Sequence, residues 1–156
     1  MTAAEQRRIL RENRWICIQM EQYVNRCLAP AGLTAIQAYI LLYILHHSDQ
    51  GTSLTAIHRE FGYSMATLSG MLKRLRSKGY IRTEPCGEDD RRKLLFGTEK
   101  GQQIRPLLEC SIRQVQGQLC DHLSPEELNA LSQIQGKMMK NLTDLREKNE
   151  KEEPEF

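Results

Sequence analysis

The chain has 156 residues, of which 40% are hydrophobic and 27% charged, and its formal net charge at pH 7 is only +2. At about 150 residues per domain this length predicts a single domain, residues 1–156, and the composition excludes a disordered chain or a fibrous repeat. No apolar run approaches the roughly 18 residues needed to cross a bilayer, and the N-terminus carries no apolar signal core. We therefore expect a cytoplasmic protein.

The five cysteines argue against a disulfide framework. An odd number of cysteines without any CxxC spacing fits neither paired disulfides nor a zinc ribbon, so we expect reduced thiols and no bound metal or cofactor. The sequence also has no glycine-rich phosphate loop and no nucleophile elbow. These absences argue against an enzyme.

Charge is distributed unevenly along the chain. Residues 64–82 contain five basic residues and no acid, whereas the last thirteen residues carry six acids and three bases. A segment with one sign of charge attracts a partner of the opposite sign, so the basic segment is where we look for function. The charge run over residues 148–156 has no hydrophobic period, and we expect it to be a disordered tail.

The first two elements are expected to be helices. Apolar residues recur at steps of three and four over about residues 5–28, which predicts an amphipathic helix that ends before Pro30. Thr34, with Gln37 three residues later, forms a capping box that begins a second, apolar helix. A third and a fourth helix are predicted on either side of Gly62, which breaks the helical period.

The segment from residue 54 to residue 77 has the spacing of a helix-turn-helix. At 100° per residue, Leu68, Leu72 and Leu75 form the buried stripe of its second helix, and the opposite face carries small or polar residues that let a helix enter a major groove. Lys78 and Arg82 are expected close to DNA phosphates. The residues that we expect to contact DNA are Ser64, Met65, Ala66, Thr67, Ser69, Gly70, Lys73 and Arg74.

After Gly79 the hydrophobic period changes to that of strands. Residues 80–84 and 93–96 are short apolar runs separated by a charged loop, CGEDDRRK, which predicts a two-stranded hairpin. This order, a hairpin directly after the second helix of a helix-turn-helix, is that of a winged helix. Arginine suits a narrow minor groove, so we expect the hairpin tip to contact DNA. Its contact residues would be Asp89, Arg91 and Arg92.

Two long helices complete the chain. Thr98 caps the first of them, and Ser124, Pro125 and Glu127 form the cap, first position and box of the second. The last helix carries an apolar stripe longer than one small domain can cover, and so does the first helix of the chain. We therefore expect residues 5–30 and 101–147 to be dimerisation helices around a DNA-binding region at residues 34–100.

These residues resemble the MarR (multiple antibiotic resistance regulator) family of winged-helix transcription factors. The resemblance is most specific between residues 54 and 101, in Ser64-x-x-Thr67, Leu75-x-x-x-Gly79-Tyr80-Ile81, Asp89-x-Arg91 and Thr98-x-x-Gly101. It implies a mainly α fold with a small β-hairpin wing and long N- and C-terminal dimerisation helices. It further implies a homodimer whose two recognition helices enter adjacent major grooves of a palindromic operator, with Arg91 in the minor groove.

Four positions depart from the pattern of this family. The family often has a long polar or basic residue at the position of Gly70, a leucine at Gly97, an arginine at Thr83 and an alanine at His58. Gly70 lacks a side chain that could read a base edge. The operator sequence therefore cannot be carried over from the family.

Members of the family commonly release DNA when they bind a small molecule, and others sense oxidation. Aromatic and apolar residues of the first two helices could line an effector pocket, although such spacing is more typical of a core: Trp15, Met20, Tyr23, Tyr39 and Tyr43. Cys17 is expected to be a buried, inert thiol, since Glu21 stands where an aromatic hydrogen-bond donor is expected. Cys86, in the wing, is the thiol more open to oxidation.

The sequence therefore predicts a homodimeric transcriptional regulator, a repressor that binds double-stranded DNA and responds to a small-molecule effector. One alternative is a regulator switched by oxidation of a cysteine thiol. Another is a winged-helix module that binds protein, which would require an apolar outer face on the fourth helix; on that face only Met65 is a large apolar residue.

Overall fold

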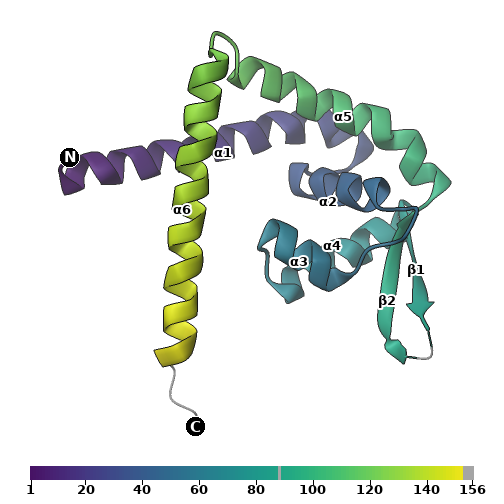
Figure 1. Cartoon of the computed structure of the whole chain (residues 1–156). Coiled ribbons are helices and arrows are strands. Elements are labelled where there is room, and N and C mark those ends of the chain that lie inside the picture. The colour runs from purple at the N-terminus through teal and green to yellow at the C-terminus, as the bar shows by residue number, and fades with distance from the viewer. Residues whose placement is uncertain (88, 153–156) are drawn as a thin grey trace. The chain divides into compact units, whose positions relative to one another are not determined.

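The computed structural model describes residues 1–87 and 89–152, and for residues 89–92 and 150–152 it describes the backbone only. The chain divides into two compact units, Met1–Val115 and Gln116–Phe156. In chain order the elements are α1 (Ala3–Leu28), the 3-10 turn η1 (Ala29–Ala31), α2 (Ala35–His46), α3 (Leu54–Phe61), α4 (Met65–Ser77), β1 (Ile81–Cys86), β2 (Asp89–Gly97), α5 (Glu99–Leu119) and α6 (Pro125–Glu152) (Figure 1). The expected fold class, helices with a two-stranded wing, is confirmed.

The helices begin where the predicted caps stand. The Thr34 side chain accepts a hydrogen bond from the Gln37 backbone while the Gln37 side chain accepts one from the Thr34 backbone, which completes the capping box of α2. Ser124 and Glu127 do the same at the start of α6. Each box satisfies backbone N–H groups that would otherwise lack partners, which explains why the helix starts were readable from sequence.

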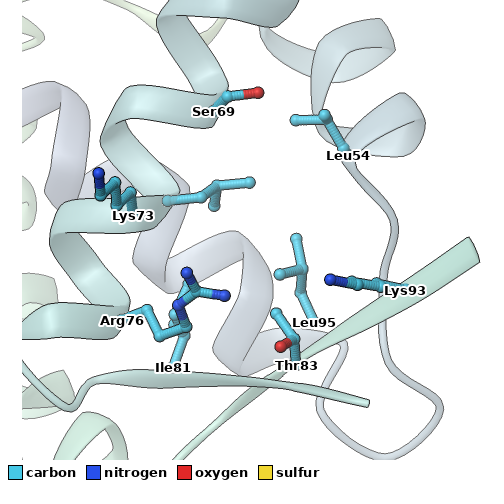
Figure 2. Close-up of a pocket in the computed structure, with 9 residues that line it drawn as sticks. Leu54, Ser69, Lys73, Arg76, Ile81, Thr83, Lys93 and Leu95 are labelled. Carbon is cyan, nitrogen blue, oxygen red and sulfur yellow. The ribbon is translucent and has the colours of Figure 1, made fainter. Parts of the chain in front are cut away.

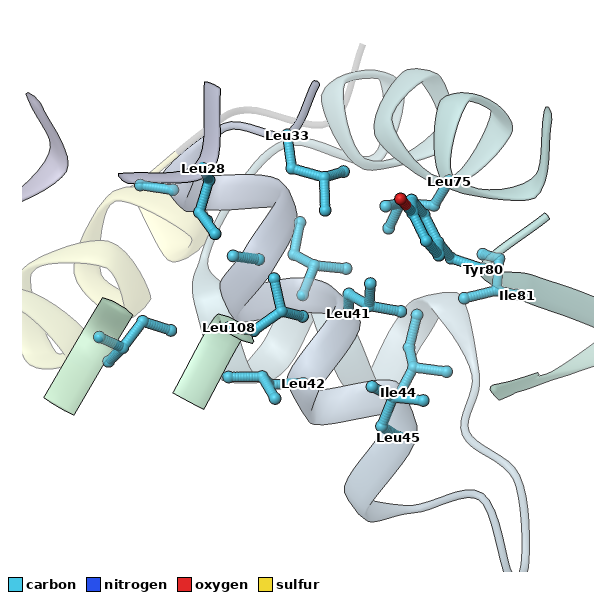
Figure 3. Close-up of a cluster of buried hydrophobic side chains, with 14 of the residues drawn as sticks. Leu28, Leu33, Leu41, Leu42, Ile44, Leu45, Leu75, Tyr80, Ile81 and Leu108 are labelled. Atoms are coloured by element: carbon cyan, nitrogen blue, oxygen red, sulfur yellow. The ribbon is translucent and has the colours of Figure 1, made fainter. Parts of the chain in front are cut away.

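The core of the first unit is built around α2. Its alanines and leucines are buried on every side, because α1, α4, the hairpin and the first part of α5 all pack around it (Figure 3). From α4 the buried side chains are the predicted stripe of Leu68, Leu72 and Leu75, and from α5 they include Leu108. The helix-turn-helix is thus fixed to the rest of the unit through the inner face of α4.

The hairpin is longer than the sequence predicts. β1 pairs antiparallel with β2 from Ile81 opposite Gly97 to Cys86 opposite Asp89, so most of the segment expected to be a loop belongs to the strands. The register shifts between Pro85 and Cys86, where proline cannot donate to the ladder and the longer β2 accommodates extra residues. Thr52, before α3, forms a short bridge with Leu95 and holds the base of the hairpin against the end of α2.

Apolar side chains remain exposed on both long terminal helices. On α1 they are Ile9, Leu10, Trp15, Ile16 and Ile18, and on α6 they are Leu131, Ile134, Met139, Leu142 and Leu145. The helix α6 runs to Glu152 and so includes residues 148–152, which the sequence analysis assigned to a tail; residues 153–156 lie outside the described residues.

In the described part of the chain, no single helix is both long and apolar enough to cross a membrane. The bent pair Ala3–Ala31 and Ala35–His46 passes the same test together by length and composition, and α2, within it, is mostly buried core.

Candidate nucleic-acid interface

The turn between α3 and α4 is built by a few local contacts. Gly62 ends α3 with φ of 72°, in the left-handed region that glycine adopts without strain, and Ser64 then caps α4. His58 reaches across the turn: its Nδ1–H donates to the Tyr63 carbonyl oxygen at 2.6 Å. His58, which replaces the family's frequent alanine, therefore stabilises the turn.

The outer face of α4 is open to solvent, as the helix-turn-helix spacing predicts. All eight residues expected to contact DNA on this element are exposed: Ser64, Met65, Ala66, Thr67, Ser69, Gly70, Lys73 and Arg74. The largest apolar side chain among them, Met65, is 43% exposed. No atom lies within 4 Å of the place where a Cβ on Gly70 would stand, so this position leaves the helix surface flat and accessible.

Two hydroxyls at the N-terminus of α4 are already engaged with each other. The Ser64 hydroxyl donates to Thr67 Oγ1 at 2.8 Å, and Ser64 Oγ accepts from the Thr67 backbone N–H at 3.2 Å. Because the Thr67 oxygen accepts this bond, its own O–H can donate outward. Thr67 rather than Ser64 is therefore the better placed hydroxyl for a phosphate oxygen at this helix N-terminus.

Two basic residues expected close to phosphates have partners within the chain. The Lys78 Nζ donates to the Gly32 carbonyl oxygen at 2.6 Å, on the connection between α1 and α2. Arg82 forms an ion pair with Glu84 and places its guanidinium 4.7 Å from the centre of the Phe96 ring. The partner of Lys78 lies 46 residues away and could not be predicted from the sequence, whereas Glu84 lies only two residues after Arg82.

A cavity of about 340 Å³ lies between α4 and the hairpin (Figure 2). Its floor is apolar, from Leu54, Leu72, Ile81 and Leu95, and its rim carries two hydroxyls, from Ser69 and Thr83, and three cations, from Lys73, Arg76 and Lys93. Figure 2 shows Arg76 and Lys93 extending from opposite sides toward the open centre. The described residues that line this cavity include three cations and no acid, which favours a negatively charged ligand.

Arg76 and Lys93 were not among the predicted site residues. Arg76 lies three residues after Lys73 on α4, the spacing of neighbours on one helix side, and this is the signal that could have found it. Lys93 is brought to the cavity only by the pairing of β2 with β1 opposite Pro85. Thr83 stands at a position where the family often has an arginine. Because Thr83 is uncharged, the positive charge of the cavity comes from Lys73, Arg76 and Lys93.

For the predicted contact residues of the wing, the structure describes the backbone only. Asp89, Arg91 and Arg92 lie in β2 and not in a loop, and their side chains are outside the described residues. Cys86 ends β1 and is exposed, and with Met65 and Lys93 it lines a second hollow between the hairpin and the start of α3. The wing and the N-terminus of α4 therefore border the same open surface.

The candidate effector residues differ in their burial. Met20, Tyr23, Tyr39 and Tyr43 are half-buried and pack against the core, whereas Trp15 is 63% exposed. Tyr43 meets Phe61 edge to face, with the ring centres 5.7 Å apart.

A group of ionisable side chains lies beside these aromatic residues. Burial raises the pKa of Tyr39 above 10.0, and the nearby Glu21, Tyr63 and Cys17 raise it further. Cys17 is exposed, so the expectation of a buried thiol was wrong: it lies in residues 11–19 of α1, whose side chains are all exposed. Among the described residues, no group of three His, Cys, Asp or Glu side chains could hold a metal ion.

The chain is similar to known proteins in both sequence and fold. Residues 31–92 match the model of the MarR family. A MarR family regulator from Listeria monocytogenes, solved with a 26-mer DNA, is 24% identical, with a TM-score of 0.81 over 94% of this chain and 97% of that one. The transcriptional regulator SlyA is 23% identical, with a TM-score of 0.80 over 87% and 94%.

A third similar structure is a complex of MepR from S. aureus with DNA, 24% identical to this chain. Its TM-score is 0.77, over 83% of this chain and 92% of that one. At these identities the solved structures establish the fold, and the match to the family model confirms the resemblance seen in the sequence.

Proposed function

Since residues 31–92 match the model of the MarR family, we propose that this chain is a transcriptional regulator that binds specific double-stranded DNA sequences as a homodimer. The observation that carries the proposal is the exposed outer face of α4. It combines small residues that fit a major groove with the cations Lys73 and Arg74, and a wing follows it directly. The Listeria and S. aureus structures, which share this fold, are complexes with DNA.

A backbone phosphate fits the cavity between α4 and the hairpin. Phosphate contacts set the register of a protein on DNA, and cations with hydroxyls are the usual donors. Lys73, Arg76 and Lys93 supply the cations and Thr83 a hydroxyl, all in the lining of one hollow. In this arrangement α4 reads the major groove and the wing reads the adjacent minor groove. The DNA backbone that separates the two grooves passes over the cavity.

Dimerisation is supported by the apolar side chains that α1 and α6 leave exposed. Trp15 on α1 is 63% exposed, and on α6 Met139 is 64% and Leu142 61% exposed. A long row of exposed apolar side chains on a soluble helix is covered by association, and a two-fold dimer is the commonest closed form. Two copies of α4 related by such an axis would read the two halves of a palindromic operator.

Repression and effector response complete the proposal. A dimer that occupies a palindrome within a promoter excludes polymerase, which makes repression the simplest outcome of tight binding. We place a small apolar effector near the half-buried tyrosines Tyr39 and Tyr43, because a ligand there would contact α2, which packs against both α1 and α4. Release of DNA on effector binding would then follow from a shift of α4.

The experiment is a binding titration with labelled DNA from the region next to this chain's own gene. We expect tight binding to a fragment that contains an inverted repeat, weaker binding to scrambled DNA at the same salt concentration, and a dimer by sedimentation. Lys73→Ala should weaken binding, whereas Lys137→Ala, an exposed cation of α6, should leave it unchanged. Equal binding to both DNAs would contradict a sequence-specific regulator.

The two alternatives are tested by separate measurements. If a variant without cysteines no longer responds to the inducing condition while it still binds DNA, then the regulator is switched by thiol oxidation. If the protein binds no DNA at low salt, then the winged region serves another partner.

A further inference from the structure

The last turn of α4 is held to the connection between α1 and α2 by one lysine side chain. Lys78 is the C-cap residue of α4, and its Nζ donates to the carbonyl oxygen of Gly32 at 2.6 Å. Gly32 ends the turn η1 with φ of 67°, and a Cβ at that position would stand 2.8 Å from the Lys78 Nζ. The lysine therefore fills the space that the glycine leaves, 46 residues away in the chain.

The same turn is held from a second side by the start of α5. The Lys100 Nζ donates to the backbone oxygen of Lys78 at 2.6 Å and lies 4.9 Å from the centre of the Tyr80 ring. The Thr98 hydroxyl donates to the Gly79 carbonyl oxygen at 2.5 Å. Carbonyls at a helix C-terminus lack intrahelical partners and carry partial negative charge, so the Lys100 ammonium stabilises this end of α4, and the Thr98 hydroxyl holds the glycine that follows it.

From this geometry we propose that Lys78 is a positioning residue that sets the direction of α4 relative to α1 and α2, and not a phosphate contact. The inference rests on the proposed DNA-binding function. A lysine that contacts a phosphate must turn its ammonium away from Gly32, which would break the hydrogen bond between the end of α4 and the α1–α2 connection. Any movement of that connection is passed through this bond to the helix that reads DNA.

The dependence of DNA affinity on salt separates the two roles. Each phosphate contact contributes about 0.9 to the slope of log affinity against log salt, so a lysine that touches phosphate in both subunits contributes about 2. We expect Lys78→Met to lower affinity about tenfold at one salt concentration with the slope unchanged. Lys73→Met is the matched control, and it should lower the slope by about 2.

A second variant tests the bond without removing charge. Lys78→Arg retains a cationic donor and should recover most of the affinity that Lys78→Met loses. Hydrogen exchange of the Lys78 and Gly79 amides in the free protein adds a readout that needs no DNA. These amides donate to Arg74 and Arg76 and should exchange faster in Lys78→Met.

The outcomes are distinct. If Lys78→Met lowers the salt slope as Lys73→Met does, or leaves both affinity and amide exchange unchanged, then the positioning role is wrong. If the wild-type protein binds no DNA, then the proposed function fails. In that case the exchange rates still decide whether Lys78 holds the end of α4.

Discussion

Gly97, the last residue of β2, stands against Leu45 of α2 so closely that a Cβ built on it would overlap the Cδ2 atom of that leucine. The backbone N–H of Gly97 donates to the Ser48 hydroxyl oxygen at 2.9 Å, and the Ser48 hydroxyl in turn donates to the Ile44 carbonyl oxygen at 2.9 Å. The base of the wing is therefore seated directly on the end of α2. The leucine that the family often has at this position would not fit here without movement of the strand.

Gly97→Ala should destabilise the fold by about 1 to 3 kcal/mol, the usual cost of an added methyl group in a packed site. Gly70→Ala is the control, because no atom lies within 4 Å of its Cβ position and alanine favours the helix by about 0.5 to 1 kcal/mol. Urea unfolding of the three proteins checks both signs. A Gly97→Ala variant as stable as the wild type would mean that the strand moves away from α2 at little cost.

The salt dependence of DNA binding should be steep. If Lys73, Arg74, Arg91 and Arg92 of each subunit contact DNA, about eight charges are neutralised, and log affinity should fall against log salt with a slope near 7. If the cavity also holds a phosphate, Arg76 and Lys93 of each subunit add to these eight charges and make the slope steeper than 7. Lys93→Gln should then lower the steeper slope by about 2, and Lys137→Gln should not change it. A wild-type slope of about 2 or less would contradict a protein that follows the phosphate backbone.

The spacing of the operator halves should be fixed. A two-fold dimer presents its recognition helices about one helical turn of DNA apart, so inserting roughly five base pairs between the half-sites moves one half to the opposite side of the duplex. We expect tight binding to be lost on this insertion and partly recovered when about ten pairs are inserted. Tight binding to the five-pair operator would argue against a rigid dimer.

Acid should weaken the contact between α2 and α5. The Nε–H of Arg105 donates to Glu109 Oε1 at 2.7 Å, and the His46 Nε2 lies 3.5 Å from the same oxygen. The Arg105 hydrogen bond is the main reason that the pKa of Glu109 lies below 4.5, and His46 adds to it. Because the pKa is lower in the folded state, the stabilisation is complete above the unfolded value and is lost as pH falls through the folded value.

Chemical unfolding of Glu109→Gln and the wild type at pH 7 and at successively lower pH measures this contribution. The wild type should be the more stable at pH 7, and the difference should shrink once the pH falls below about 4.5. A difference that stays constant with pH would assign the effect of the substitution to packing. The lowered pKa of Glu126, caused by its own backbone N–H and Ser124, is common to both proteins and cancels in the comparison.

The sequence predicted what local signals determine. The caps at Thr34 and Ser124 fixed the helix starts because each satisfies backbone groups within four residues. The buried stripe of α4 followed from the helical period alone. These features depend on neighbours in the chain, so they can be predicted without knowledge of the fold.

Contacts between distant residues could not be predicted in the same way. Lys78 was expected at a phosphate because its charge belongs to the basic segment, but Gly32 lies 46 residues away and accepts its hydrogen bond. Lys93 reaches the cavity through strand pairing, and the length of the hairpin depends on a register shift at Pro85. Periodicity specifies which face of an element is buried, but not the partner that its polar residues meet.

The absence of a long polar side chain at Gly70 leads to the last prediction. The exposed face of α4 contains no arginine, asparagine or glutamine near its N-terminus, and these are the side chains that form bidentate contacts with guanine or adenine. Hydroxyl and methyl contacts discriminate bases weakly. Specificity should therefore depend more on the wing, where Arg91 would sense the width of the minor groove.

Arg91→Ala should lower specific binding by at least about 1 to 2 kcal/mol and weaken the preference for A·T-rich flanks. Ser69→Ala, on the exposed face of α4, should cost less and act mainly at one base position in each half-site. Competition binding at fixed salt, with operators varied separately in the flanks and in the half-sites, measures both effects. If Ser69→Ala lowers the affinity more than Arg91→Ala does, or if Arg91→Ala leaves the flank preference intact, then α4 determines the base preference. In that case the lack of a side chain at Gly70 does not make specificity depend on the wing.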